Sequence, residues 1–191
     1  MLKDRDLKYL IIILLIAGTA LTARSGYFYA KGMLAQYLLN EAWEESMRTK
    51  DVVKAWGWAD TYPVGRLSIP SINYSSVVLE GINNETLAFG PAHLSLSSSP
   101  GEEGNIVIMG HRDSFFRELK EVKPGQTIVL ESLSRVQSYT VSDIEVVSPE
   151  DTFIIQETSG ASITLITCYP FDYIGPAPER YVVRGVSEEN I

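Results

Sequence analysis

Three side chains of different chemistry lie at the ends of short apolar segments. Cys168 ends the segment SITLITC, His111 directly follows the segment NIVIMG, and Arg180 opens the segment RYVVRGV. A cysteine attacks a carbonyl carbon as the thiolate, which requires a proton acceptor or a cationic neighbour. A guanidinium near the sulfur offers fixed donors to the oxyanion that forms on the attacked carbonyl. The chain therefore contains the groups that cysteine-based acyl transfer needs, but their types alone do not show that they meet in space.

Each of these residues also has a structural alternative. A free cysteine is commonly a small buried hydrophobe, a single histidine often lies in a turn, and Arg180 fits a surface or capping role. Cys168 is the only cysteine of the 191 residues, which excludes an internal disulfide and a multi-thiolate metal site. The chain has two histidines, and no nucleophile lies near His93 in the sequence. We therefore expect His93 to be structural or to line the substrate-binding cleft.

The elements that must position these residues are short strands. From residue 64 onward, segments rich in Val, Ile, Thr and Tyr are separated by Gly, Pro, Ser and Asn. Strands this short and numerous predict a mostly β domain over residues 64–191, built as a closed antiparallel or mixed barrel. Two short helices are expected at about residues 85–89 and 114–119. Residues at strand ends lie on the rim of a barrel, where loops form a cleft and strands fix positions.

The N-terminal segment predicts a membrane anchor. Residues 9–23, YLIIILLIAGTALTA, carry no charge and follow Lys3, Arg5 and Lys8. They are fewer than the ~20 residues that cross a bilayer, but snorkelling of Lys8 and Arg24 makes a single span feasible. Positive charge ahead of the span predicts a cytoplasmic N-terminus and an extracytoplasmic catalytic domain. We assign residues 1–24 to this anchor; the alternative is a cleaved secretory signal, because GTA or LTA presents small residues to a peptidase.

Residues 25–63 are predicted to form a helical linker. Within residues 31–50, apolar side chains recur mostly at steps of three and four, with acidic residues on the other face. The apolar positions are Met33, Leu34, Tyr37, Leu38, Trp43 and Met47. This pattern predicts an amphipathic helix that packs on the domain or lies near the membrane surface.

The charge of the chain excludes one class of partner. The net charge is −8, and the part beyond residue 24 contains 12 basic against 22 acidic residues. A domain this acidic has no basic patch for binding phosphates, so we expect no nucleic acid partner.

Glu150, Asp151 and Glu157 precede the cysteine segment and raise the alternative of a calcium site. Scattered carboxylates normally form a solvated face, so we predict no metal and no cofactor.

The motifs around the three reactive residues resemble those of one family. TLITC (164–168) is similar to the TLxTC signature of sortases, which are cysteine transpeptidases, and it ends in Cys168. GHRD resembles the segment that carries the catalytic histidine, and RYVV, twelve residues after Cys168, resembles the start of the last strand with its arginine. GRLSIPSI and LAFGPAHL match the opening strand and a segment with a second histidine. The resemblance covers about residues 64–187, and the run TLITCYPFDYIGPAPERYVV is similar to short, single-domain sortases of proteobacteria, grouped near class D.

The resemblance implies an eight-stranded sortase-type β-barrel and a cleft for a C-terminal sorting signal of the LPxTG kind. It implies that Cys168 is the nucleophile, that His111 exchanges protons with the departing and incoming amines, and that Arg180 holds the substrate and the oxyanion. Thr167 is a candidate for lining the oxyanion site through its hydroxyl or its backbone. Arg184 is the alternative arginine, since a four-residue offset keeps it on the same strand face.

Some alternatives stay open at this point. Asp113 either orients His111 or caps the helix expected at residues 114–119, and its position favours the cap. The chain could also be a secreted cysteine hydrolase that releases its acyl intermediate to water, or a non-enzymatic, membrane-tethered β-domain that binds a peptide or partner. The exact sorting motif and the amine acceptor depend on loop geometry that the sequence does not reveal.

Overall fold

The computed structural model of the chain describes residues 4–187, with side chains from residue 8 onward. The chain divides into two units, one ending at Tyr37 and one beginning at Leu38. Helix α1 (Asp4–Thr49) is continuous across this division, and strand β1 begins at Pro63. The boundary expected between the anchor (residues 1–24) and the linker (residues 25–63) is therefore not a break in the helix. The assignment of the three predicted ranges to anchor, linker and catalytic domain stays a prediction.

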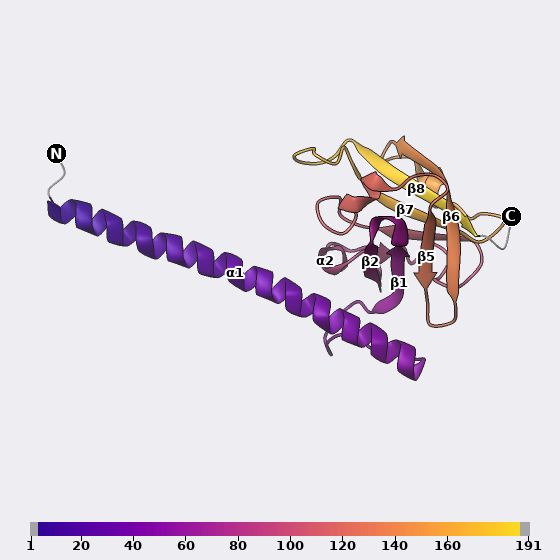
Figure 1. Ribbon diagram of the computed structural model, residues 1–191, viewed down its shortest axis with the longest axis horizontal. Helices are drawn as coiled ribbons and strands as arrows, with labels where there is room; N and C mark the ends of the chain where they lie inside the picture. Colours follow the sequence, from indigo (N-terminus) through magenta and orange to yellow (C-terminus); the bar gives the residue numbers. More distant parts are fainter. Residues whose placement is uncertain (1–3, 188–191) are drawn as a thin grey trace. The chain divides into compact units, whose positions relative to one another are not determined.

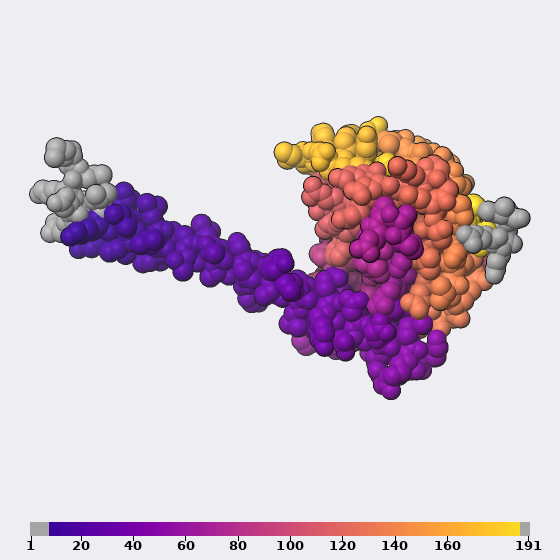
Figure 2. All heavy atoms as spheres, in the orientation of Figure 1, coloured from indigo at the N-terminus to yellow at the C-terminus, as the bar shows by residue number. Residues whose placement is uncertain are grey.

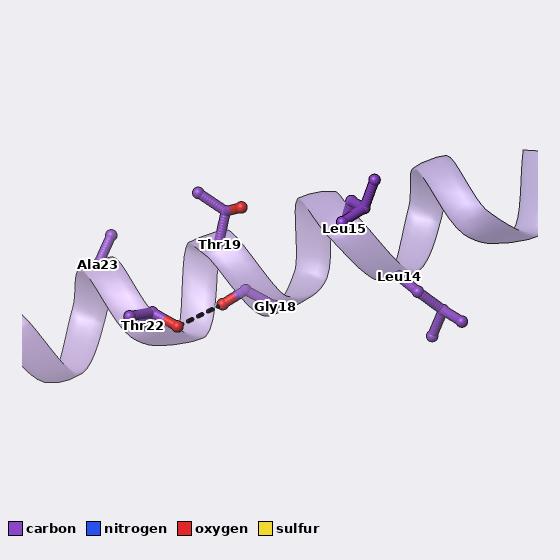
Figure 3. A pocket seen from close by; sticks show the side chains of 6 residues that line it. All are labelled: Leu14, Leu15, Gly18, Thr19, Thr22 and Ala23. Atoms are coloured by element: carbon purple, nitrogen blue, oxygen red, sulfur yellow. Dashed lines mark hydrogen bonds between the residues drawn. The ribbon is translucent and has the colours of Figure 1, made fainter.

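The first unit contains the apolar part of α1. The helix from Lys8 to Thr49 includes a stretch long and apolar enough to cross a membrane, by length and composition. Its apolar side chains point outward; Leu14 and Leu15 are 62% and 64% exposed. The hydroxyl of Thr22 donates to the carbonyl of Gly18 at 2.8 Å (Figure 3), which satisfies this polar group within the helix, as an apolar surrounding requires. These properties suggest a membrane anchor.

The last part of α1 packs within the second unit. Leu39 and Trp43 are buried against Val77 and Leu79 of strand β2 (Tyr74–Glu80). Of the six predicted positions, the first three are exposed by more than half of their surface: Met33, Leu34 and Tyr37. They belong to the first unit, whereas the other three predicted positions lie in the second: Trp43 is buried, and Leu38 and Met47 are partly buried.

The second unit contains a closed eight-stranded barrel, which confirms the predicted fold class (Figure 1). Its strands follow one another around the barrel in the order β1-β2-β3-β4-β7-β8-β6-β5. Besides β2, they are β1 (Pro63–Ile69), β3 (Ala92–His93), β4 (Asn105–Met109), β5 (Thr127–Glu131), β6 (Val136–Val147), β7 (Ser162–Tyr169) and β8 (Glu179–Ser187). The pairs β2·β3 and β4·β7 are parallel, and the other neighbours are antiparallel.

Short helices connect the strands. They are α2 (Asn84–Phe89) and the 3₁₀ helices η1 (Pro70–Ile72), η2 (Arg117–Glu121) and η3 (Thr152–Ile155). Helix α2 confirms the helix expected at residues 85–89. The helix expected at residues 114–119 begins later, because the N–H groups of Ser114 and Phe116 both donate to the carbonyl of His111 and form a turn first.

Strands β4 and β7 are buried on both faces, which explains their continuous apolar sequences, whereas β8 alternates buried and partly exposed residues. The interior of the barrel contains Ile106, Ile108, Ile163, Leu165 and Val183. The alternate residues of the same strands form an outer cluster, with Val107, Ile166 and Val182 packed against Ile154 of η3 and against Leu94. The strands that lead to His111 and Cys168, β4 and β7, are therefore packed on both of their faces.

Replacing Trp43 with alanine tests the packing of α1 within the second unit. Trp43 is fully buried, so its removal should lower the free energy of unfolding by about 3–5 kcal/mol. The matched control is Trp58→Ala, because Trp58 is 84% exposed and its loss should change stability by less than about 0.5 kcal/mol. Urea unfolding of the detergent-solubilised chain, followed by circular dichroism, makes the comparison. Equal effects of the two substitutions would show that this packing is wrong.

Candidate active site

The parallel pairing of β4 and β7 brings His111 and Cys168 to one end of the sheet. The ladder ends at the pair Met109 and Ile166, and the N–H of Gly110 continues it by donating to the carbonyl of Ile166 at 3.1 Å. His111 follows Met109 by two residues, and Cys168 follows Ile166 by two residues. Because the strands are parallel and in register, His111, just past the end of β4, and Cys168, near the end of β7, lie at the same end of the sheet. His111 is exposed and Cys168 is partly exposed, so a substrate can reach both.

A buried threonine fixes the turn that carries His111. Thr167 is 2% exposed, and its hydroxyl donates to the carbonyl of Gly110 at 2.7 Å. A Cβ atom at Gly110 would lie 2.8 Å from the ring of Phe116, so only glycine allows this close approach. The hydroxyl of Thr167 thus has a structural partner. Its predicted oxyanion role stays a prediction, for which the backbone N–H is the better candidate.

Arg180 lies directly opposite Cys168 in the antiparallel pairing of β7 and β8. Directly paired residues project to the same face, with Cβ atoms typically about 4.5–5.5 Å apart. That face is the outer one, since Cys168 alternates with Thr167 and shares its side with Ile166 of the outer cluster. The Nη1 of Arg180 donates to the carbonyls of Ala177 and Glu179 at 3.3 and 3.0 Å. The guanidinium is therefore anchored by backbone atoms beside the sulfur.

The alternative arginine, Arg184, has other partners. It pairs with Thr164 of β7, which lies four residues before Cys168 along the strand. Its Nη2 lies 2.6 Å from the carboxylate of Glu145, and its guanidinium carbon lies 4.8 Å from the centre of the Phe153 ring. The register therefore favours Arg180 as the arginine that acts on a group bound to Cys168.

Arg112, which the sequence analysis did not single out, is the most extensively bonded side chain near the site. It is 7% exposed, and its guanidinium donates to main-chain carbonyls of the loop that follows Cys168. Its Nε also donates to the carboxylate of Asp113 at 3.2 Å. Helix η2 has Phe116 at its N-cap, and among the described residues no side chain caps it. The cap predicted for Asp113 is therefore wrong, because its carboxylate is held by Arg112.

His93 belongs to a separate buried network. It is 3% exposed, its Nδ1 lies 2.8 Å from the carboxylate of Glu80, and its Nε2 lies 3.0 Å from the carbonyl of Ser98. The hydroxyl of Ser97 lies 3.2 Å from the same Nε2. These contacts join β2 and β3 to the following loop and favour the structural interpretation. Its alternative role in substrate binding stays a prediction without support from these contacts.

Aromatic rings close the interior of the barrel beneath the cysteine. Tyr169 and Tyr181 stack with ring centres 6.1 Å apart, and Phe171 contacts both rings edge-on. Burial, and then the neighbouring Tyr169, raise the pKa of Tyr181, so its phenol stays neutral at physiological pH. The cluster gives the end of β7 a rigid apolar support.

The carboxylates considered for calcium do not form a cluster. Within residues 4–187, no group of three or more His, Cys, Asp or Glu side chains is arranged to hold a metal ion. Glu157 instead accepts hydrogen bonds from the hydroxyl of Ser98 at 3.1 and 3.2 Å.

Comparison with known proteins agrees with this fold. The family model described as a sortase domain matches residues 67–188. Sortase D of Bacillus subtilis is 37% identical over 122 residues, which are 63% of this chain and 62% of that protein. The chain spans about three fifths of the length of this relative and of the sortase A from Streptococcus agalactiae, which is 26% identical over 155 residues.

Solved structures show the same architecture. A sortase D5 transpeptidase from Clostridium perfringens superposes with a TM-score of 0.67 at 22% identity, covering 81% of this chain and 98% of that one. Sortase A from Listeria monocytogenes gives a TM-score of 0.60 at 29% identity, covering 66% and 87%. The chain therefore belongs to the sortase family, and its similarity is of the class D kind.

The reactivity of Cys168 should depend on His111. An imidazolium beside the sulfur stabilises the thiolate, so His111→Gln should slow alkylation of Cys168 at pH 7 by about tenfold or more. Since the chain has one cysteine, mass spectrometry of iodoacetamide-treated protein reports this site alone. Lys120→Gln is the control, because Lys120 is an exposed cation of η2. Equal alkylation rates in the wild type and in His111→Gln would contradict the predicted neighbourhood.

Proposed function

We propose that the chain is a membrane-anchored cysteine transpeptidase that cleaves an LPxTG-like C-terminal sorting signal and transfers the acyl product to an amine. The observation that carries the proposal is the register that sets Cys168 opposite Arg180 and at the same sheet end as His111. These groups are a nucleophile, an acid–base group and an oxyanion donor. Family membership and the sortase D relative support the same reaction class.

In the first half of the reaction, the thiolate of Cys168 attacks the carbonyl carbon of the residue before the scissile bond. The electron pair of the carbonyl moves to its oxygen, and the guanidinium of Arg180 stabilises this oxyanion. Collapse of the tetrahedral intermediate breaks the C–N bond, and the imidazolium of His111 gives its proton to the departing amine. The product is a thioacyl enzyme and a free C-terminal fragment.

In the second half, an amine attacks the thioacyl carbonyl. His111, now neutral, accepts the proton of this amine, and Cys168 leaves as the thiolate. The enzyme returns to its starting state, and an amide bond is exchanged for another amide bond. Water in place of the amine would give hydrolysis, which is the alternative function from the same intermediate.

The apolar part of α1 supports attachment to a membrane. We propose a single span with the N-terminus in the cytoplasm, because Lys3, Arg5 and Lys8 precede the apolar residues. The catalytic domain then lies outside, where it meets protein substrates and amine nucleophiles exposed at the cell surface. No nucleic acid is expected as a partner of so acidic a domain.

The direct test incubates the full chain in detergent with an LPxTG-containing peptide and increasing concentrations of an amine such as triglycine. Transfer predicts a peptide–amine product that increases with amine concentration, detected by mass spectrometry, and Cys168→Ala should abolish it. Formation of the acid product alone, at every amine concentration, would establish the hydrolase. Full cellular function of Cys168→Ala would instead favour the non-enzymatic β-domain.

Two arginines on the same face of β8 provide a matched pair of variants. Arg180→Met should lower kcat/KM for transfer by about 10²–10³-fold, because it removes the donor to the oxyanion. Arg184→Met should leave kcat/KM close to the wild-type value, since its partners are Glu145 and the Phe153 ring. If Arg184→Met had the larger effect, the assignment of the oxyanion role to Arg180 would be wrong.

A further inference from the structure

The loop between β7 and β8, residues 170–178, is held to the rest of the barrel by one buried arginine. Arg112 Nη1 donates to the carbonyl of Pro170 at 3.0 Å. Its Nη2 donates to the carbonyl of Tyr173 and, at 3.2 Å, to that of Gly175. Its guanidinium carbon also lies 5.9 Å from the centre of the Tyr173 ring. A single planar group thus binds three points of the loop.

The loop itself is largely on the surface. Tyr173 is 45% exposed and Ile174 is 97% exposed, and Figure 2 shows this yellow segment at the surface of the barrel. Few of its side chains can therefore hold it by apolar packing, apart from Phe171 in the aromatic cluster. Burial of a guanidinium is costly unless its N–H groups are paired, and the three carbonyls and the Asp113 carboxylate provide this pairing. The arrangement is therefore specific to the fork of an arginine.

The same side chain connects all three residues proposed for catalysis. Arg112 directly follows His111 in the chain, and the loop that it binds begins after Cys168 and ends before Arg180. Arg180 in turn donates to the carbonyls of Ala177 and Glu179, at the end of this loop. The conformation of the loop therefore sets where the guanidinium of Arg180 lies relative to the sulfur. A change in the loop would move the oxyanion donor while leaving the strands in place.

We propose that Arg112 is a positioning residue of the transpeptidase site, which fixes the β7–β8 loop so that Arg180 and His111 are aligned with Cys168. The inference rests on the proposed function, because alignment matters only for a reaction that uses all three groups. Arg112 acts through the loop carbonyls and through the adjacent turn.

The variants for the test are Arg112→Met and Arg112→Lys, with Arg117→Met as the matched control on the exposed side of the next turn. Methionine removes the N–H donors of the guanidinium but keeps a long, unbranched side chain. Lysine keeps the charge, but one ammonium group cannot bind three separated carbonyls. If Arg112→Met does not fold, Arg112→Lys alone decides the outcome.

Three quantities are measured on the full chain in detergent: kcat and KM for transfer from an LPxTG peptide to triglycine, and hydrogen–deuterium exchange of peptides covering the loop and the β7 strand. We expect both Arg112 variants to lower kcat by about 10–100-fold, the loss typical of misplaced catalytic groups. KM should change much less. Exchange should become faster in residues 170–178 and stay unchanged in residues 162–167, where the barrel core lies.

Several outcomes would overturn the proposal. One is a kcat of the Arg112 variants equal to that of Arg117→Met, and another is hydrogen exchange in the loop equal to that of the wild type. A third is faster exchange in strand β7 as well as in the loop, which would make Arg112 a general stabiliser of the barrel. Failure of the proposed function looks different, because the wild-type chain itself would then form no peptide–amine product.

Discussion

The parallel ladder between β4 and β7 is the constraint on which the site depends. These strands are separated by more than 50 residues of chain, and their backbone hydrogen bonds keep five residue pairs in register. Because the residues that follow a ladder inherit its register, the backbone brings His111 and Cys168 to the same end of the sheet. Both faces of the pair are buried, so the strands that lead to these two residues are firmly packed.

The two threonines of the TLITC segment strengthen this ladder at both ends. Thr164 donates through its hydroxyl to the side chain of Asn105 at 2.7 Å, near the start of β4. The side-chain amide of Asn105 in turn donates to the carbonyls of Ile154 and Gln156, in the segment that covers the outer cluster. Thr167 donates to the carbonyl of Gly110, at the end of β4. The signature can thus be understood as a set of cross-strand hydrogen bonds that end in a reactive sulfur.

The barrel and the reactive residues were predictable because their signals are local. Short β-branched runs, punctuated by glycine and proline, indicate strands, and Cys168 is the only cysteine of the chain. The adjacency of β4 and β7 is not local and was not predicted; the resemblance to sortases implied only the barrel as a whole. Arg112 was missed because arginines are usually exposed and its acceptors are backbone carbonyls 58–63 residues away. Periodicity could not distinguish exposed apolar positions of α1, such as Met33, from packed ones, such as Trp43, because it does not reveal where a long helix begins to pack.

The most direct test is chemical cross-linking between the end of β4 and the end of β7. The variant His111→Cys is treated with a short bifunctional thiosulfonate, and Cys168 is the only other thiol of the chain. The account predicts rapid cross-linking within one molecule, seen as a joined peptide pair in the mass spectrum. The control Glu103→Cys lies two residues before β4, roughly 25 Å away along an extended strand, and should remain uncross-linked. Equal cross-linking of both variants, or none in His111→Cys, would contradict the central claim that these two side chains share one end of the sheet.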